Sequence, residues 1–259
     1  MYLSCLLIAV GDNPDRERPG RRWLRNLYHV HQRLCLAFPS ITRRNNDTDF
    51  LKPFDCEDFF TGNVHTERGA AVGFLFRIDP RPGGGAVILV QSADKPDWEY
   101  AFGLKKDAVN GRGRPIGNAG YLLAAPPQVK LYNPFFANGH RLQFRLVANP
   151  VKTINDENGR QNAKGEVKKC RVPLVDDEAQ RAWLGRKLES AASIESLIVD
   201  NKMPLYFRKR KEDRSGKIQP VMFHGILRVQ NADSFQEVIR HGIGPAKAFG
   251  CGLLSIARA

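Results

Sequence analysis

The chain has 259 residues, 42% of them hydrophobic and 26% charged, a composition typical of a soluble globular protein and not of a disordered one. Forty basic against 27 acidic residues leave a net charge of +13, which favours a polyanionic partner, with nucleic acid ahead of an anionic membrane. The five cysteines form no C-x-x-C pair, which argues against a zinc site and a disulfide scaffold and favours free thiols in a reducing cytosol. The apolar start lacks the basic region of a signal peptide, and no apolar run has the length of a membrane span.

The first half of the sequence predicts four strands and one helix. Stretches rich in large apolar residues predict strands at 2–10, 73–79, 86–91 and 142–148. Asn26 is expected to cap a helix whose apolar residues recur at helical spacing until Pro39. Residues 110–120 hold four glycines and are expected to form a surface insertion.

The second half predicts two further helices among strands. An acidic first turn, Asp176–Glu178, indicates a helix that continues to Ala191. Strands are expected at 205–207, 218–229 and 253–257, and a helix at 232–241. Both halves fit a βαββαβ plan loosely, so we predict an α+β protein with two sheet domains, residues 1–150 and 151–259.

The loop before the last strand carries two Gly-apolar-Gly triplets around a segment that includes Lys247. Its glycines permit positive φ, and such a turn exposes N–H groups that can cradle phosphates. The spacing excludes the dinucleotide fingerprint and the Walker loop. The alternative is a tight turn with no ligand. The candidate RNA-binding residues of this loop are Gly242, Gly244, Lys247, Gly250 and Gly252.

Basic residues cluster in two stretches of the second half, 152–171 and 202–217. Either stretch alone is typical of a solvated face, but both together with the glycine loop favour RNA binding. No aromatic-rich RNP string is present, which favours reading of a hairpin by charge and shape over base stacking. The candidate contacts are Lys152, Lys164, Lys168, Lys169, Arg171, Arg208, Lys209, Arg210 and Lys217, with Arg21, Arg22 and Arg25 placed to clamp a strand before the first helix.

Several motifs together resemble the CasE family, the CRISPR RNA-processing endoribonucleases of type I-E systems. They cover the first forty residues and the C-terminal half, whereas segments around 11–22, 43–70 and 100–120 are longer than in compact members. The motifs are Met1-Tyr-Leu-Ser4, Leu27-Tyr28-x-x-His31-Gln32, Leu36-Ala-Phe-Pro39, Arg145–Thr153, Lys164–Leu174, Ser215–Gln219 and Gly242–Gly252.

The resemblance implies two ferredoxin-like (RRM-like) domains and a cytoplasmic, metal-independent enzyme that needs no cofactor. Such an enzyme cuts repeat hairpins of a precursor transcript at the 3′ base of the stem by 2′-OH attack, which gives 2′,3′-cyclic phosphate and 5′-OH ends. It then stays on the hairpin of the mature crRNA as a subunit of the Cascade complex, with other protein subunits as partners, and meets DNA only through that complex.

The resemblance places the family's catalytic histidine on His31 and its active-site tyrosine on Tyr28. Residues three apart share a helix face, and an imidazole is the natural proton carrier near neutral pH. His29 is expected to face elsewhere. The alternative is that His31 is a core histidine, since Leu34 and Cys35 continue the same face. Two other functions stay open: a non-catalytic RNA-binding subunit, and an enzyme acting on a small phosphorylated ligand through the glycine loop alone.

Overall fold

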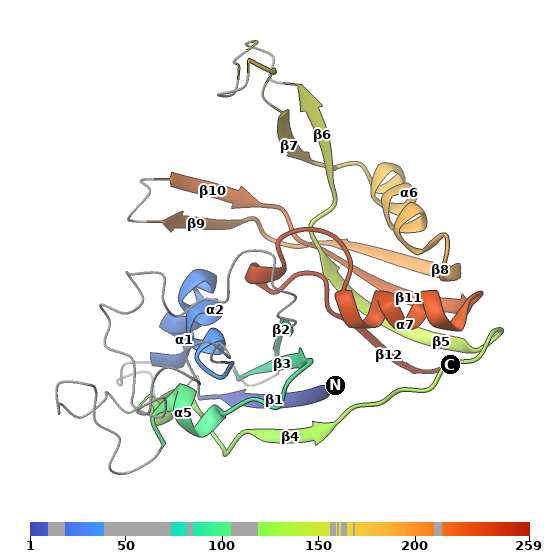
Figure 1. Ribbon diagram of the computed structural model, residues 1–259. Coiled ribbons are helices and arrows are strands. Elements are labelled where there is room, and N and C mark those ends of the chain that lie inside the picture. Colours follow the sequence, from blue (N-terminus) through green and yellow to red (C-terminus); the bar gives the residue numbers. More distant parts are fainter. Residues whose placement is uncertain are drawn as a thin grey trace. The chain divides into compact units, whose positions relative to one another are not determined.

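The computed structural model describes residues 1–9, 19–38, 74–81, 85–104, 119–155, 159, 161, 165–167, 169–209 and 214–259 (Figure 1). The chain divides into two units, Met1–Pro134 and Phe135–Ala259. The longer segments expected around 11–22, 43–70 and 100–120 lie largely outside the described residues.

The first unit is a four-stranded antiparallel sheet in the order β2-β3-β1-β4. Its chain order is strand, helix, strand, strand, helix, strand, which with this sheet order is the ferredoxin-like arrangement. The elements are β1 (Tyr2–Ile8), α1 (Pro19–Leu24), α2 (Leu27–Cys35), β2 (Phe74–Pro80), β3 (Ala86–Ser92), α5 (Trp98–Phe102), the 3-10 helix η2 (Gly120–Leu122) and β4 (Gln128–Leu131).

One apolar cluster joins the helices of this unit to one face of its sheet. Strands place successive side chains on opposite faces, so alternate residues of β1, β2 and β3 enter the cluster. The central members are Leu6, Ile8, Phe76, Ile88 and Val90 from the strands, Val30 and Leu34 from α2, and Trp98 and Phe102 from α5.

The second unit repeats the plan, with the antiparallel sheet order β12-β5-β11-β8. Trp183 of α6 stacks on Phe223 of β11 with ring centroids 6.2 Å apart, and Phe235 of α7 is fully buried. The elements of this sheet and its helices are β5 (Arg141–Ala148), α6 (Asp177–Leu188), β8 (Ala192–Asn201), β11 (Val221–Val229), α7 (Ala232–His241), the 3-10 helix η3 (Lys247–Phe249) and β12 (Leu254–Arg258).

Two antiparallel ribbons interrupt the second unit and leave its sheet as separate arms (Figure 1). The ribbon β6–β7 (Val151–Asn155 and Lys169–Pro173) lies between β5 and α6 in the chain. The ribbon β9–β10 (Leu205–Lys209 and Arg214–Ile218) lies between β8 and β11. The basic stretches of the sequence therefore fall largely on these two ribbons.

The predicted fold class is confirmed, but the boundary near residue 150 differs from the division that the structure shows. Strand β5 pairs with β11 and β12, so it opens the second unit instead of closing the first. The fourth strand of the first unit is β4, whose four residues alternate between polar and apolar but are all exposed, so this short strand has no buried face. The helix expected to reach Ala191 ends at Leu188, because the chain enters β8 at Ala192.

Gly20, in the first turn of α1, packs closely against the end of β1 and the residue after it. A β-carbon built on Gly20 would lie 2.0 Å from the carbonyl oxygen of Ala9 and 2.9 Å from Cγ2 of Ile8. The approach is possible only without a side chain, so Gly20 fixes where α1 leaves the sheet.

We expect Gly20→Ala to lower the free energy of unfolding of the first unit by about 1–3 kcal/mol, because backbone must move to admit the methyl group. Denaturant unfolding followed by tryptophan fluorescence measures this, since Trp23 and Trp98 lie in that unit. Gly185→Ala is the matched control. No atom lies within 4 Å of a β-carbon at this helical position, and the change should stabilise α6 by roughly 0.5–1 kcal/mol. Equal effects of the two changes would contradict the role given to Gly20.

Candidate functional site

Helix α2 holds His31 at the margin of its buried stripe. The Asn26 side chain accepts a hydrogen bond from the His29 backbone N–H at 3.4 Å and caps the helix as predicted. Val30 and Leu34 have no exposed surface, whereas His31 is half-buried. Arg33 donates from Nη1 to the Ala101 carbonyl at 2.9 Å, which ties α2 to α5. His31 therefore lies on a helix that is held by packing, and part of the residue is open to solvent.

The ring of His31 has aromatic and sulfur neighbours. It stacks on Phe74 at 5.5 Å between centroids with planes 27° apart, and on Phe76 at 6.4 Å with planes 16° apart. The sulfur of Cys35 lies 3.6 Å from Nε2 and 4.0 Å from Nδ1. This environment orients the ring and limits its rotation.

Sequence reasoning did not find Phe74 and Phe76. Their Phe-x-Phe spacing places both rings on one face of a strand. That pattern alone indicates a buried face, and the pairing of this face with α2 depends on tertiary structure.

The structure describes some of the other residues expected at the cleavage site. Tyr28 lies in α2 three residues before His31, and its side chain is outside the described part of the structure. His29 is exposed, as expected for a residue off the His31 face. Arg21 and Arg22 of α1 and Arg25 after it are all exposed. The first unit thus has three exposed guanidinium-bearing residues just before α2 in the chain.

The glycine loop follows α7 and closes on itself. The Ile243 N–H donates to the Gly252 carbonyl at 2.9 Å, and the Gly252 N–H donates to the Val147 carbonyl of β5 at 2.7 Å. Gly242, Gly244, Gly250 and Gly252 all have positive φ, and so does Ala246 at 65°. The loop is therefore a tight, hydrogen-bonded turn that leads into β12.

Close packing explains why two of these positions hold glycine. A β-carbon on Gly244 would lie 2.9 Å from the ring of Trp183, and one on Gly252 would lie 3.0 Å from the Ile243 carbonyl oxygen. Lys247 opens the short helix η3 and is exposed. Partial burial lowers the pKa of its ammonium group below the usual value, because desolvation disfavours the charged form. Lys247 is the one charged residue between Gly242 and Gly252.

The ribbon β6–β7 presents basic side chains on both faces. Residues paired across an antiparallel ribbon share a face. Arg171 pairs with Thr153 and Lys169 with Asn155, whereas Lys152 pairs with Val172. Lys169 and Arg171 therefore share one face and Lys152 lies on the other, and all three are exposed.

The remaining basic candidates are described less completely. Lys217 of β10 is exposed and pairs with Tyr206. Arg208 and Lys209 belong to β9, with only their backbones described. Lys164, Lys168 and Arg210 lie outside the described residues.

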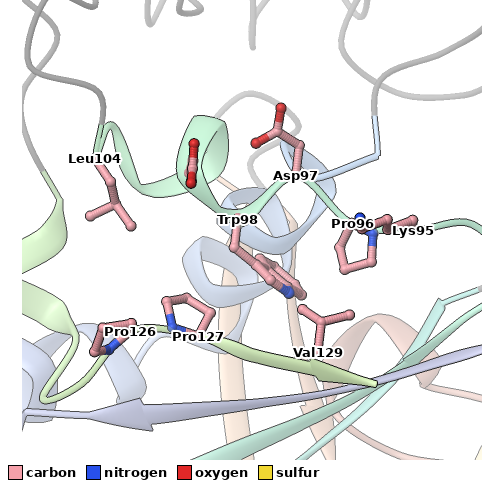
Figure 2. Close-up of a pocket in the computed structure, with 9 residues that line it drawn as sticks. Lys95, Pro96, Asp97, Trp98, Leu104, Pro126, Pro127 and Val129 are labelled. Carbon is pink, nitrogen blue, oxygen red and sulfur yellow. The ribbon is translucent and has the colours of Figure 1, made fainter. Parts of the chain in front are cut away.

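The first unit also contains a pocket of about 510 Å³ (Figure 2). None of the residues predicted for the site lines it, and the Asp97 carboxylate accepts a hydrogen bond from the Tyr100 backbone N–H at 2.9 Å. The pocket is lined by Lys95, Pro96, Asp97, Trp98, Glu99, Leu104, Pro126, Pro127 and Val129.

Within the described ranges, no three His, Cys, Asp or Glu side chains come together in a way that suits a metal ion. In the same ranges, no helix has the length and apolarity needed to cross a membrane.

Comparison with known proteins identifies the family. A family model described as CRISPR associated protein matches residues 1–258. The chain belongs to this CRISPR-associated family. It is 35% identical over 258 residues to the "CRISPR system Cascade subunit CasE" of Escherichia coli, with 99% of both chains covered. It is 32% identical over 271 residues to the "CRISPR-associated endoribonuclease Cse3" of Thermus thermophilus, which covers 99% of this chain and 100% of the relative.

Solved structures of the family share the fold. The crystal structure of the E. coli CRISPR-associated protein Cas6e matches with a TM-score of 0.61 and 32% identity, covering 100% of both chains. A structure of the endoribonuclease Cse3 bound to 19 nt RNA matches with a TM-score of 0.63 and 29% identity, covering 99% of this chain and 100% of that one. This chain therefore matches these relatives over nearly their full length.

Proposed function

We propose that this chain is the endoribonuclease that cuts the repeat hairpins of a precursor CRISPR transcript and stays on the mature crRNA as a Cascade subunit. Full-length relatives are named a Cascade subunit and an endoribonuclease, and one of them is solved with RNA bound. The observation that carries the proposal is His31, which packing orients on α2 while part of its surface stays open to solvent. The enzyme would work in the cytoplasm and meet DNA only through the complex.

The reaction needs no group beyond the RNA and the side chains of this chain. The 2′-oxygen attacks the adjacent phosphorus, its proton passes to a base, and the bond to the 5′-oxygen breaks as that oxygen takes a proton from an acid. The products are a 2′,3′-cyclic phosphate and a 5′-OH. His31 moves one of these protons and Tyr28 is the second candidate group, while Arg21, Arg22 and Arg25 balance charge on the phosphorane.

The ribbons and the glycine loop of the second unit would hold the hairpin. A-form RNA hides its base edges in a deep, narrow groove, so a stem is read mainly through phosphates and shape. Lys169 and Arg171 share a ribbon face and suit one phosphate strand, and Lys152 serves the other face. Lys247 and the N–H groups of the glycine loop would contact a further phosphate.

A non-catalytic RNA-holding subunit is the second candidate. The stacking of His31 on Phe74 and Phe76 is what a structural histidine would also show. This function requires hairpin binding with the RNA left intact.

His31→Ala should slow single-turnover cleavage of the cognate repeat RNA about 10²–10⁴-fold, the usual effect of losing a general acid or base. The assay is run in EDTA, and the hairpin affinity should stay close to that of the wild type. His29→Ala is the matched control, since His29 is exposed on another part of the same helix. Cleavage by His31→Ala at the wild-type rate would contradict the catalytic role. Tight binding by a wild type that leaves the RNA intact would favour the second candidate.

Lys169→Ala with Arg171→Ala should weaken hairpin binding and reduce its salt dependence. Each phosphate contact that is lost removes about 0.7–0.9 from the slope of log K against log salt. Titrations at several salt concentrations measure this slope. Arg186→Ala with Lys187→Ala removes the same charge from the exposed last turn of α6 and should leave the slope nearly unchanged. If both double variants changed the slope equally, net charge and not the ribbon would account for binding. A flat slope for the wild type would instead favour a small phosphorylated ligand.

A further inference from the structure

Strand β4 forms one edge of the first sheet, and within the described residues it pairs only with β1. The Tyr132 N–H donates to the Met1 carbonyl at 2.9 Å, so these two residues form a hydrogen-bonded pair of the antiparallel ladder. Such pairs alternate along a strand, and Val129 and Leu131 therefore direct their N–H and C=O groups away from β1. The outer edge of β4 thus presents the backbone groups of two residues.

The side chains of the same two residues are apolar and lie on the core face of the sheet. Val129 is opposite Ser4 and Leu131 is opposite Tyr2. Alternation along β1 places them on the face of Leu6, a residue of the core cluster. Val129 is nevertheless 37% exposed and Leu131 is 64% exposed. The apolar face therefore continues onto β4 and is left partly open to solvent there.

The pocket of Figure 2 adjoins this edge and lies between α5 and β4. Trp98 and Val129 both line it, and the indole extends from α5 toward β4 (Figure 2). The indole nitrogen is buried and has no hydrogen-bond partner among the described residues. Most of the remaining lining is apolar, with three prolines and Leu104. The pocket therefore suits an apolar side chain, and a ligand that also brings an acceptor gains from the unpaired donor.

The rim of this pocket is acidic, unlike the chain as a whole. Residues 94–99 carry three carboxylates and one ammonium group, whereas the chain has a net charge of +13. Two of the carboxylates, those of Asp97 and Glu99, line the pocket. Phosphates would be repelled here, and a basic side chain would be attracted. Charge and the open strand edge together favour a polypeptide over RNA as the occupant.

We propose that the outer edge of β4 and the adjoining pocket bind an extended segment of another protein subunit of the Cascade complex. The segment forms main-chain hydrogen bonds with Val129 and Leu131 and adds a strand to the first sheet. Its residue opposite Val129 shares the core face, so its apolar side chain packs on Trp98. A basic residue of the segment lies near Glu99. The inference rests on the proposed function, from which membership of the complex is taken.

Hydrogen exchange of the full-length chain, measured residue by residue, tests the added strand. We expect the Val129 and Leu131 amides to exchange about tenfold or more slowly in the complex assembled with crRNA and the other protein subunits than in the free chain. The Lys130 amide is the internal control, because it is directed toward β1 and should change little. Unchanged exchange of Val129 and Leu131 in the assembled complex would overturn the inference.

Two further exchange measurements identify the occupant. The chain bound to the repeat hairpin alone should exchange at Val129 and Leu131 like the free chain. Protection by the hairpin alone would overturn the inference in favour of RNA. Protection in the free chain that rises with protein concentration would overturn it in favour of a second copy of this chain.

Val129→Pro removes the outward amide without breaking the ladder to β1. We expect this variant to bind the rest of the complex about tenfold more weakly than Val129→Ala, which keeps the amide, since one hydrogen bond is lost. Both variants should cut repeat RNA like the wild type. Normal cleavage with equal affinities of the two variants for the complex would overturn the inference alone. A wild type that neither cuts nor binds the hairpin would instead contradict the proposed function.

The acidic rim is tested by Glu99→Lys, which should weaken binding to the rest of the complex about two- to fivefold. Glu178→Lys is the matched control, because Glu178 is also exposed in the first turn of a helix, in the second unit. It should bind like the wild type. Equal losses in the two variants would overturn the choice of a basic segment as the occupant.

Discussion

The packing of one stripe of α2 on the first sheet is the constraint on which the candidate site depends. Val30 and Leu34 are completely buried, so the rotation of α2 about its own axis is fixed. His31 follows Val30 directly, and that rotation leaves it at the edge of the stripe, over Phe74 and Phe76 of β2. The same packing seats Cys35 one turn further along, against the imidazole. Orientation of the ring and its access to solvent thus both result from where an apolar stripe ends.

The second unit has the same βαββαβ plan, and the two ribbons inserted in it carry basic residues. Its helices and sheet bury the core, and the two ribbons leave the sheet at points where the plan tolerates an insertion, between β5 and α6 and between β8 and β11. A two-stranded arm outside the core can expose basic residues on both faces, as Lys152 and Arg171 show. In the glycine loop, Gly244 is required by the ring of Trp183. The glycines therefore shape the loop, and Lys247 is its charged residue.

Local sequence signals predicted a helix correctly where the residues at its two ends define where it begins and stops. The helix expected at 232–241 begins after the cap residue Asn231 and ends before Gly242, as predicted. Strand β5 was recognised but assigned to the wrong half, because its partners β11 and β12 lie far along the chain. His31 was selected by resemblance to the family. Its neighbour Cys35 on the same helix face could be read from the sequence, but its contacts with Phe74 and Phe76 could not, because they depend on how a strand and a helix far apart in sequence pack together.

The chemistry assigned to this chain is tested most directly with a repeat RNA that carries a single 2′-deoxynucleotide on the 5′ side of the scissile phosphate. Removing that hydroxyl removes the nucleophile while leaving the hairpin, its phosphates and the protein unchanged. In single-turnover reactions with EDTA, we expect the all-ribose RNA to be cut to a 2′,3′-cyclic phosphate and the substituted RNA to bind with equal affinity and remain intact. Cleavage of the substituted RNA at the same phosphate would contradict 2′-OH attack, and with it the role proposed for His31.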